Sequence, residues 1–559
     1  MFNFLSFIIF YFVCIYSVIG YGFIFKKLFL NKSYENDYDY LGFYGIFILI
    51  IYSYISHFFL SHNLHHNVIL LSIGIIFFLK NFKNLLKKNY LFNLNIIFLI
   101  FFVSFFIYKT HDDFPYYHFP YTYYLTQNSM IIGLGQFNHG FRTPSSLFYF
   151  NSLFYLPLIK YYMFNFLPVL VMGFANVIFI KKIFYYLNQK KINYIFYLNL
   201  FFLLFINIFF YRIQEHGTDK SAQILILILF IEMIVFTKFL KNYEKNIDNI
   251  IILLGIIISL KSFYFLYLIF CLPFLIILYS LKKFFIIKRI IINKLFILFS
   301  LFLIVLLFQN FLNSSCFIYP VHFTCLNNFE WSLGNFEVLK MNDHYQLWSK
   351  AGLTPNFRVD NPQIYLQNFN WVSNWFNSYF FNKISDFLLG LIFLILVLNF
   401  TFYNKIKLKL NTYHHDLILY AFVIILFLEW FYNHPALRYG GYCLIVIILS
   451  YPFSIIFERY KNNSKETKKK FLVLLSISFL VFFSRNVNRI SDEIVKYNYQ
   501  PIKEPYFRIS DKHFRFDKEF KILISNYERC ILGINCNQNL YKKIKKNNFG
   551  NYIFVKEND

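Results

Sequence analysis

The stretch Lys294 to Leu312, KLFILFSLFLIVLLFQNFL, decides the fold class of this chain. After Lys294 it contains no charged residue, and about 20 such residues in a helix cross the hydrocarbon layer of a membrane. Similar stretches recur along the 559 residues, of which 58% are hydrophobic and 15% are charged. Soluble domains carry about 25% charged residues, and disordered chains lack the 24% aromatic residues found here. We predict an all-α membrane protein, a multi-span helical bundle of about 13–14 transmembrane helices.

The predicted spans share an apolar run bounded by polar or basic residues. They are 4–25, 41–60, 66–80, 90–108, 164–180, 193–211, 220–240, 248–263, 264–281, 294–312, 384–402, 416–432, 439–457 and 470–484. No Lys or Arg precedes the first span, whereas Lys26 and Lys27 follow it, which places the N-terminus outside. Because successive spans cross the membrane in alternating directions, the most basic connections then lie in the cytoplasm, as the positive-inside rule requires. These connections are 81–89, 181–192, 282–293, 403–415 and 458–469.

This arrangement predicts a multi-pass protein of the bacterial inner membrane. It also explains the net charge of +26 without a nucleic-acid partner. We divide the chain into additional N-terminal helices (1–89), a transmembrane core (90–484) and an extramembrane tail (485–559). Loops 109–163 and 313–383 and the tail are predicted to lie outside, in the periplasm. This topology implies that membrane lipids surround the spans.

Two close cysteine pairs lie in the predicted outer segments. Cys316 and Cys325 are separated by a short stretch, and so are Cys530 and Cys536. In an oxidising compartment such pairs favour two disulfides. The alternatives are four free thiols, or a zinc site that includes His322, although the spacing fits no common zinc pattern.

Ionisable residues where the membrane ends are candidates for function. Thr110 to His118 contains His111 and two adjacent carboxylates, Asp112 and Asp113. Such a pair is explained by cation binding or by one member acting as a base with a raised pKa. The alternative is a solvated helix cap. The next segment, Tyr121 to Ser129, is amphipathic and is predicted to lie along the membrane interface.

Four further outer segments carry polar side chains. They are Gly133 to Ser146 with His139 and Arg142, Arg212 to Lys220 with Glu215 and Asp219, Lys261 between apolar neighbours, and Asn433 to Gly441 with His434 and Arg438. Their hydroxyl, amide and cationic groups suit recognition of a sugar or a phosphate. The alternatives are solvent-exposed surface loops, a Lys261 side chain that snorkels to the interface and an Arg438 side chain that anchors to lipid headgroups.

A multi-span bundle with an acidic pair after an early span, an amphipathic segment in the same loop and basic residues at later outer ends resembles the GT-C-type glycosyltransferases. More narrowly, Thr110–Pro144, Glu215–Asp219, the Cys316-Phe-Ile-Tyr-Pro-x4-Cys325 segment and the His434-Pro-x-x-Arg438-Tyr-Gly-Gly segment resemble an uncharacterised bacterial multi-pass membrane family. Residues 1–89 are an N-terminal addition to the GT-C architecture.

The GT-C resemblance implies transfer of a sugar, with inversion, from a polyprenyl-phosphate donor to a glycan or lipid acceptor. It implies that Asp112 or Asp113 deprotonates the acceptor or helps to hold a metal. The residues implied to bind donor phosphate are Lys261, Arg438 and Arg212, and those implied to bind substrate are His111, His118, His139, Arg142, Glu215, Asp219 and His434. A divalent cation is compatible with the carboxylates but is not assumed, and the residues point to no certain cofactor.

Two other functions are weighed against glycosyl transfer. A transporter or flippase of lipid-linked saccharides would carry polar residues in the middle of its spans, and Glu232 and Glu429 are the best examples here. A surface polysaccharide polymerase or ligase also needs outer arginines but not an Asp-Asp pair. No nucleotide-binding loop of the P-loop or dinucleotide type occurs in the sequence.

Overall fold

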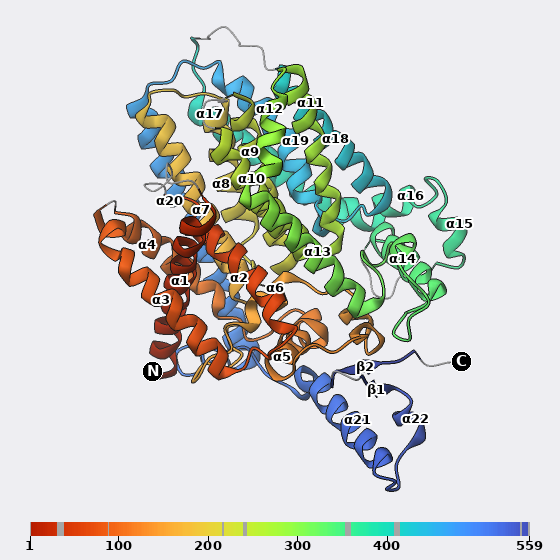
Figure 1. Ribbon diagram of the computed structural model, residues 1–559. Coiled ribbons are helices and arrows are strands. Elements are labelled where there is room, and N and C mark those ends of the chain that lie inside the picture. The colour runs from red at the N-terminus through yellow and green to blue at the C-terminus, as the bar shows by residue number, and fades with distance from the viewer. Residues whose placement is uncertain are drawn as a thin grey trace.

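The computed structural model describes residues 2–30, 38–87, 89–214, 217–238, 243–352, 359–406, 414–547 and 550–556. Over these residues the chain is a helical bundle with one short β-hairpin near its C-terminus (Figure 1). Ten helices are long and apolar enough to cross a membrane, and three shorter apolar helices accompany them. The prediction of an all-α, multi-pass membrane protein is therefore confirmed for the bundle, with ten full-length candidate spans in place of 13–14.

The first helices form a tightly packed unit. They are α1 (Phe2–Phe29), α2 (Leu41–His57), α3 (Leu64–Lys87) and α4 (Tyr90–Phe102). A Cβ atom added to Gly20 of α1 would lie 1.8 Å from the carbonyl oxygen of Gly74 in α3, and one added to Gly45 of α2 would lie 1.9 Å from that of Val18. Small residues let membrane helices approach closely, and they fix how these three helices cross.

The central helices are those whose apolar surface is buried all round. They are α7 (Phe166–Asn188), α8 (Tyr194–Phe209), α9 (Gly217–Lys238) and α10 (Tyr243–Leu260). A helix that is apolar on every face is expected in the middle of a bundle. α9 packs against α7, α8, α10, α18 (His414–Asn433) and α19 (Gly441–Glu458), so its first turn lies where several helix ends meet.

The later helices complete the bundle around this centre. They are η7 (Ser262–Phe270), α11 (Cys271–Ser280), α12 (Phe284–Ile292), α13 (Lys294–Ser314), α17 (Ser385–Phe402), α18 (His414–Asn433), η10 (Leu437–Tyr439), α19 (Gly441–Glu458) and α20 (Ser464–Tyr497). As predicted, the chain breaks between α10 and η7. α20 continues beyond the predicted span end at 484, because its polar last turns pack against the chain before α5: Glu493 accepts a hydrogen bond from the Tyr108 amide at 2.9 Å.

Two long connections fold into short helices. The first contains η2 (Val103–Phe105), η3 (Phe114–His118), α5 (Phe119–Gln127), η4 (Leu134–Gln136), η5 (His139–Phe141) and α6 (Ser146–Ser152). The second contains η8 (His322–Thr324), α14 (Asn335–Lys350), α15 (Pro362–Leu366), α16 (Val372–Trp375) and η9 (Phe376–Ile384). In Figure 1, α14, α15 and α16 project from one side of the bundle.

The prediction that Tyr121 to Ser129 lies along the membrane interface is wrong. α5 is largely buried, because α6 covers it on one side and α21 of the tail (Arg515–Ile531) on the other. Its aromatic residues pack inside the protein: Tyr121 contacts Phe148, and Tyr124 contacts Phe516 of the tail. The tail, which is distant in the sequence, therefore covers the face of α5 that the local sequence pattern assigns to lipid.

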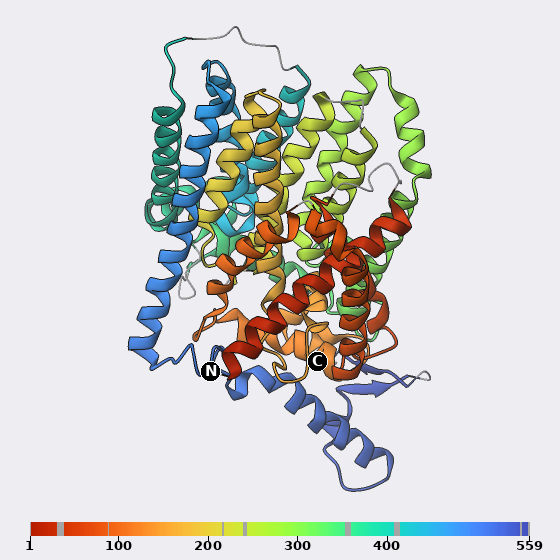
Figure 2. The same ribbon diagram turned by 90° about the vertical axis from the view of Figure 1, so that its left-hand side faces the viewer.

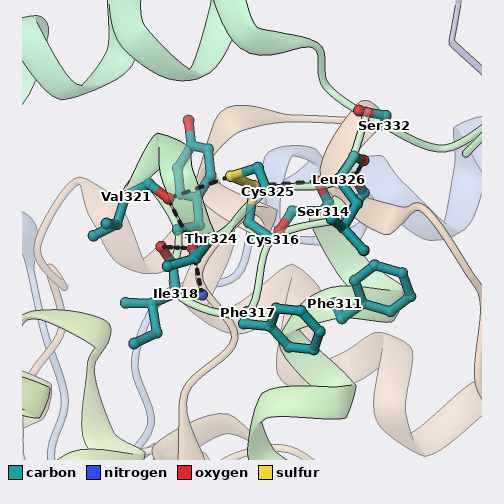
Figure 3. The surroundings of a disulfide bond; sticks show 12 residues. Phe311, Ser314, Cys316, Phe317, Ile318, Val321, Thr324, Cys325, Leu326 and Ser332 are labelled. Atoms are coloured by element: carbon teal, nitrogen blue, oxygen red, sulfur yellow. Dashed lines mark hydrogen bonds between the residues drawn. A yellow bond between two sulfur atoms is a disulfide. The ribbon is translucent and has the colours of Figure 1, made fainter. Parts of the chain in front are cut away.

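Both predicted disulfides are confirmed. Cys316–Cys325 closes a ten-residue loop directly after α13 (Figure 3). The Thr324 hydroxyl lies inside this loop, donates to the Val321 carbonyl at 2.7 Å and accepts from the Ile318 amide at 3.1 Å. The disulfide and this hydrogen-bonded turn together hold the start of the second connection in one conformation.

The tail after α20 is a small folded unit with the second disulfide, Cys530–Cys536. It contains η11 (Asp511–Phe514), α21 (Arg515–Ile531), α22 (Gln538–Tyr541) and an antiparallel hairpin of β1 (Ile544–Lys546) and β2 (Tyr552–Phe554). Ile553 forms a parallel bridge with Ile132, so the hairpin is extended by a segment of the first connection. The hairpin is the one part of the described chain that departs from the all-α prediction.

The two connections and the tail meet at one end of the bundle, which we call the loop end. The Gln136 side chain donates to the carbonyls of Trp331 and Ser332, and the Lys556 amide donates to the Glu330 carbonyl at 2.8 Å. Figure 2 shows the N-terminus and the tail at this same end. The predicted topology places all of these segments on one side of the membrane, and their contacts agree with that grouping.

A labelling experiment tests the sidedness. Lys340 on α14 and Lys190 between α7 and α8 are both exposed, so a cysteine at either position is accessible on its own side. We expect a membrane-impermeant maleimide added to intact cells to modify Lys340→Cys and to leave Lys190→Cys unmodified, in a background in which the exposed Cys271 is serine. Modification of Lys190→Cys alone would reverse the topology.

Candidate functional site

The polar site at the loop end is built around Asp219, the third residue of α9. A carboxylate in the first turn of a helix is favoured by the helix dipole. The Asp219 side chain is 2% exposed, and each of its oxygens faces a different cation. The Lys261 ammonium lies 2.8 Å from Oδ1, and Nε of Arg438 lies 3.1 Å from Oδ2.

Lys261 occupies the break in the chain where α10 ends at Leu260. The Ser145 hydroxyl fixes this end, because it donates to the Leu260 carbonyl at 2.6 Å and accepts from the amide of Leu147 to cap α6. The Lys261 ammonium lies 4.7 Å from the ring centroid of Tyr439. The lysine is therefore held between a carboxylate and an aromatic face rather than extended toward lipid.

Arg438 is positioned by its backbone. Its turn, η10, is held by the Gln223 amide, which donates to the carbonyls of Leu437 and Arg438 at 3.3 and 3.2 Å. Gly440 has φ of +95°, a left-handed conformation that favours glycine and lets the chain turn into α19. Burial lowers the pKa of the Arg438 guanidinium, and Asp219, Tyr439, Tyr117 and Asp113 together raise it by more, so the net pKa is raised and the side chain stays charged.

Asp113 completes the group from the first connection. Its Oδ2 lies 3.6 Å from Nη2 of Arg438 and 3.4 Å from Nδ1 of His111. The Asp113 side chain is 31% exposed, compared with 2% for Asp219. We call Asp113, Asp219, Lys261 and Arg438 the four-residue cluster. Within it the accessible carboxylate is Asp113, and the buried one is Asp219.

The structure separates the two members of the predicted acidic pair. Asp112 is exposed, and among the described residues it makes no ion pair. Asp113 lies one residue further on, at the start of the helical turn that leads into η3, and faces Arg438. A difference of one residue in a turn therefore decides which carboxylate joins the cluster.

The histidines of the first connection lie beside the cluster. His118 is within electrostatic reach of Asp113 and Arg438, and burial lowers its pKa to about 4, so it is neutral at pH 7. His139 accepts or donates a hydrogen bond with Tyr116 at 3.0 Å, and burial lowers its pKa, with Arg142 contributing in the same direction. Neutral imidazoles offer one hydrogen-bond donor and one acceptor each.

Arg142 connects the two long connections. Its Nη1 lies 2.8 Å from Oε1 of Glu337 and 3.2 Å from the Tyr319 hydroxyl, and its Nε donates to the Gly135 carbonyl at 3.2 Å. Its predicted role in substrate binding stays a prediction, and the contacts themselves serve to hold the disulfide-closed loop against the first connection.

The remaining predicted residues are placed as follows. Arg212 lies just after α8, where the Lys220 ammonium donates to its backbone carbonyl at 2.6 Å. Glu215 falls outside the described residues. His434 follows α18, and its ring packs against Phe263 and Tyr439.

A divalent cation does not fit the four-residue cluster. The Arg438 guanidinium lies between Asp113 and Asp219, at the place where two carboxylates would share a metal. No group of three or more His, Cys, Asp or Glu side chains within the described ranges could hold a metal ion. We therefore derive no step through a metal.

The carboxylates inside the spans have bonded partners. Glu232 forms an ion pair with Lys182 and accepts from the Tyr40 hydroxyl at 2.8 Å. Glu429 accepts from the Asn433 amide at 3.0 Å. Buried carboxylates with such partners hold helices together.

Residues 4–445 match the model of a family described as a domain of unknown function, DUF8201. The chain belongs to this family. The DUF8201 match contains all four members of the cluster and ends before α20 and the tail. No curated protein and no solved structure gives a significant match.

Sequence reasoning missed several residues that shape the site. Tyr439 lies under both Lys261 and Arg438, and the Tyr264 hydroxyl donates to the carbonyls of Asp219 and Arg438. Gln223 holds η10. Gln223 is a polar residue in an apolar span one turn after Asp219, and that position is the signal that could have revealed it.

Proposed function

We propose that this DUF8201 protein is a membrane glycosyltransferase that moves a sugar from a polyprenyl-phosphate donor to an acceptor hydroxyl at the loop end. The observation that carries the proposal is the convergence of Asp113, Asp219, Lys261 and Arg438 from four separate segments. Carboxylate and cationic groups in one polar site are the two kinds of group that such a transfer needs.

The reaction assigns a different role to each side chain. Asp113 accepts the proton of the acceptor hydroxyl, because it is the accessible carboxylate of the cluster. The hydroxyl oxygen forms a bond to the anomeric carbon as the bond between that carbon and the phosphate oxygen breaks. The polyprenyl phosphate leaves with the bonding electrons, and Lys261 and Arg438 stabilise its charge. Asp219 positions the two cations.

Release of polyprenyl phosphate tests this proposal. The purified protein in nanodiscs is incubated with a panel of polyprenyl-phosphate-linked sugars and a glycan acceptor. We expect at least one donor to yield free polyprenyl phosphate and a glycosylated acceptor of inverted configuration. Movement of intact donor across the bilayer without loss of its sugar would instead indicate a flippase.

Lys261→Ala is expected to weaken donor binding more than acceptor binding. Removal of one charge-assisted contact to the phosphate costs about 1.5–3 kcal/mol, which corresponds to a rise of about tenfold or more in KM for the donor. The KM for the acceptor should change by less than about twofold, which corresponds to about 0.4 kcal/mol. An equal rise in both KM values, or none, would remove Lys261 from phosphate binding.

A further inference from the structure

Lys350 is a buried cation outside the four-residue cluster. It is the last residue of α14, and only 1% of its surface is exposed. Burial lowers the pKa of its ammonium. A lysine buried to this degree normally has an acidic partner, because the desolvation of an ammonium is costly.

The described part of the chain supplies no such partner. The Lys350 ammonium lies 5.4 Å from the ring centroid of Trp371 and 5.2 Å from that of Tyr432, and 3.4 Å from Oε1 of Gln346. None of the described carboxylates forms an ion pair with it. Two aromatic faces attract a cation without neutralising it, so one positive charge is left uncompensated here.

His434 provides a second group without a partner beside this lysine. It lies two residues after Tyr432, whose ring faces Lys350, and Lys350 and Lys261 both act electrostatically on its imidazole. Its Nδ1 is buried and has no hydrogen-bond partner in the described structure. Its ring also packs against Tyr439, the residue over which Lys261 lies.

The four-residue cluster and the pair formed by Lys350 and His434 differ in net charge. In the four-residue cluster the carboxylates of Asp113 and Asp219 balance the cations of Lys261 and Arg438. An incoming anion must therefore compete with carboxylates there. Lys350 and His434 offer a net positive charge and a free imidazole nitrogen, which together match an oxyanion.

We propose that Lys350 and His434 form an anion-binding subsite that takes the phosphate group of a lipid-linked donor next to the four-residue cluster. This inference rests on the proposed function, because it names the place of the leaving phosphate. It adds a residue, Lys350, that supplies the excess positive charge which the ion-paired Lys261 and Arg438 lack.

Direct binding measurements test the subsite without turnover. The full-length protein in phosphatidylcholine nanodiscs is titrated with farnesyl phosphate, farnesol and inorganic phosphate. We expect Lys350→Met to raise the Kd for farnesyl phosphate at least tenfold and to leave the Kd for farnesol unchanged. Lys350→Arg keeps the charge and should stay within threefold of the wild type, and His434→Gln should weaken binding about three- to fivefold.

Lys340→Met, an exposed lysine on the same helix, is the matched control and should bind farnesyl phosphate as the wild type does. If Lys350→Met does not fold, His434→Gln carries the test. Unchanged farnesyl phosphate binding in Lys350→Met, or in His434→Gln where the Met variant does not fold, overturns the subsite, and so does an equal loss for farnesol. Inorganic phosphate that binds as tightly as farnesyl phosphate overturns its assignment to a lipid.

Failure of the phosphate subsite and failure of the proposed function can be told apart. Asp113→Asn should bind farnesyl phosphate at least as tightly as the wild type, since Asp113 acts on the acceptor and its carboxylate competes with an anion for Arg438. If farnesyl phosphate binding depends on Lys350 but the protein transfers no sugar from any donor tested, the subsite is confirmed and the transferase function is contradicted. Sugar transfer that is unaffected by Lys350→Met would contradict the subsite alone.

Discussion

Asp113→Asn is expected to lower the rate of sugar transfer by about 10²–10⁴-fold, the contribution typical of a general base. The amide keeps the shape of the side chain and cannot accept the acceptor proton. The Asp113 side chain is 31% exposed, and its contacts with Arg438 at 3.6 Å and with His111 at 3.4 Å are long. Its loss should therefore leave the fold intact, and the measurement is single-turnover transfer together with the apparent melting temperature.

Asp112→Asn is the matched control for this variant. The residue is adjacent, carries the same carboxylate and is exposed to solvent. We expect its transfer rate to stay within about twofold of the wild type, a difference well below the contribution of a general base. Loss of activity in Asp112→Asn with an active Asp113→Asn would exchange the two assignments.

Asp219→Ala is expected to destabilise the protein strongly. It removes a buried carboxylate that pairs with two cations, and breaking a buried ion pair from one side costs about 3–5 kcal/mol. Lys261 and Arg438 would be left next to each other without a shared partner. The expected result is a clear fall in the apparent melting temperature of the purified protein, together with loss of transfer.

Asp511→Ala controls for the loss of an ion pair as such. Asp511 pairs with Lys518 at 2.8 Å in the tail, and its side chain is 94% exposed, so its removal should leave the melting temperature unchanged. A double variant, Asp219→Ala with Arg438→Met, should recover part of the lost stability, because it removes one of the unpaired charges. Equal melting temperatures for Asp219→Ala and the wild type would show that the cluster does not hold the helix ends together.

Much of the fold follows from local features of the sequence. Apolar runs bounded by charge predict helices well, since a membrane span must satisfy its own backbone hydrogen bonds. The short separation of Cys316 and Cys325 also made their disulfide predictable. The burial of α5 was not predictable, because α21, almost four hundred residues further on, covers it. The bridge from Ile132 to Ile553 depends on the same long-range docking.

The site was predictable to a similar degree. Asp113, Asp219, Lys261 and Arg438 stand out as ionisable residues at span ends, and the structure brings them together. The choice of Asp113 over Asp112 depends on the rotation of one turn, which no sequence pattern fixes. Lys350 was missed because it lies at the end of a polar helix, where a lysine is ordinary; its burial by Trp371 and Tyr432 comes from tertiary packing.

A structure determined with a bound donor analogue tests the central claim most directly. The protein would be imaged by cryo-electron microscopy with a non-transferable polyprenyl-phosphate sugar, in which a methylene group replaces the bridging oxygen. The account predicts density for the phosphate among Lys261, Arg438 and Lys350, with the anomeric carbon facing the carboxylate of Asp113. Density for the headgroup at the opposite end of the bundle, or in contact with none of these side chains, would contradict it.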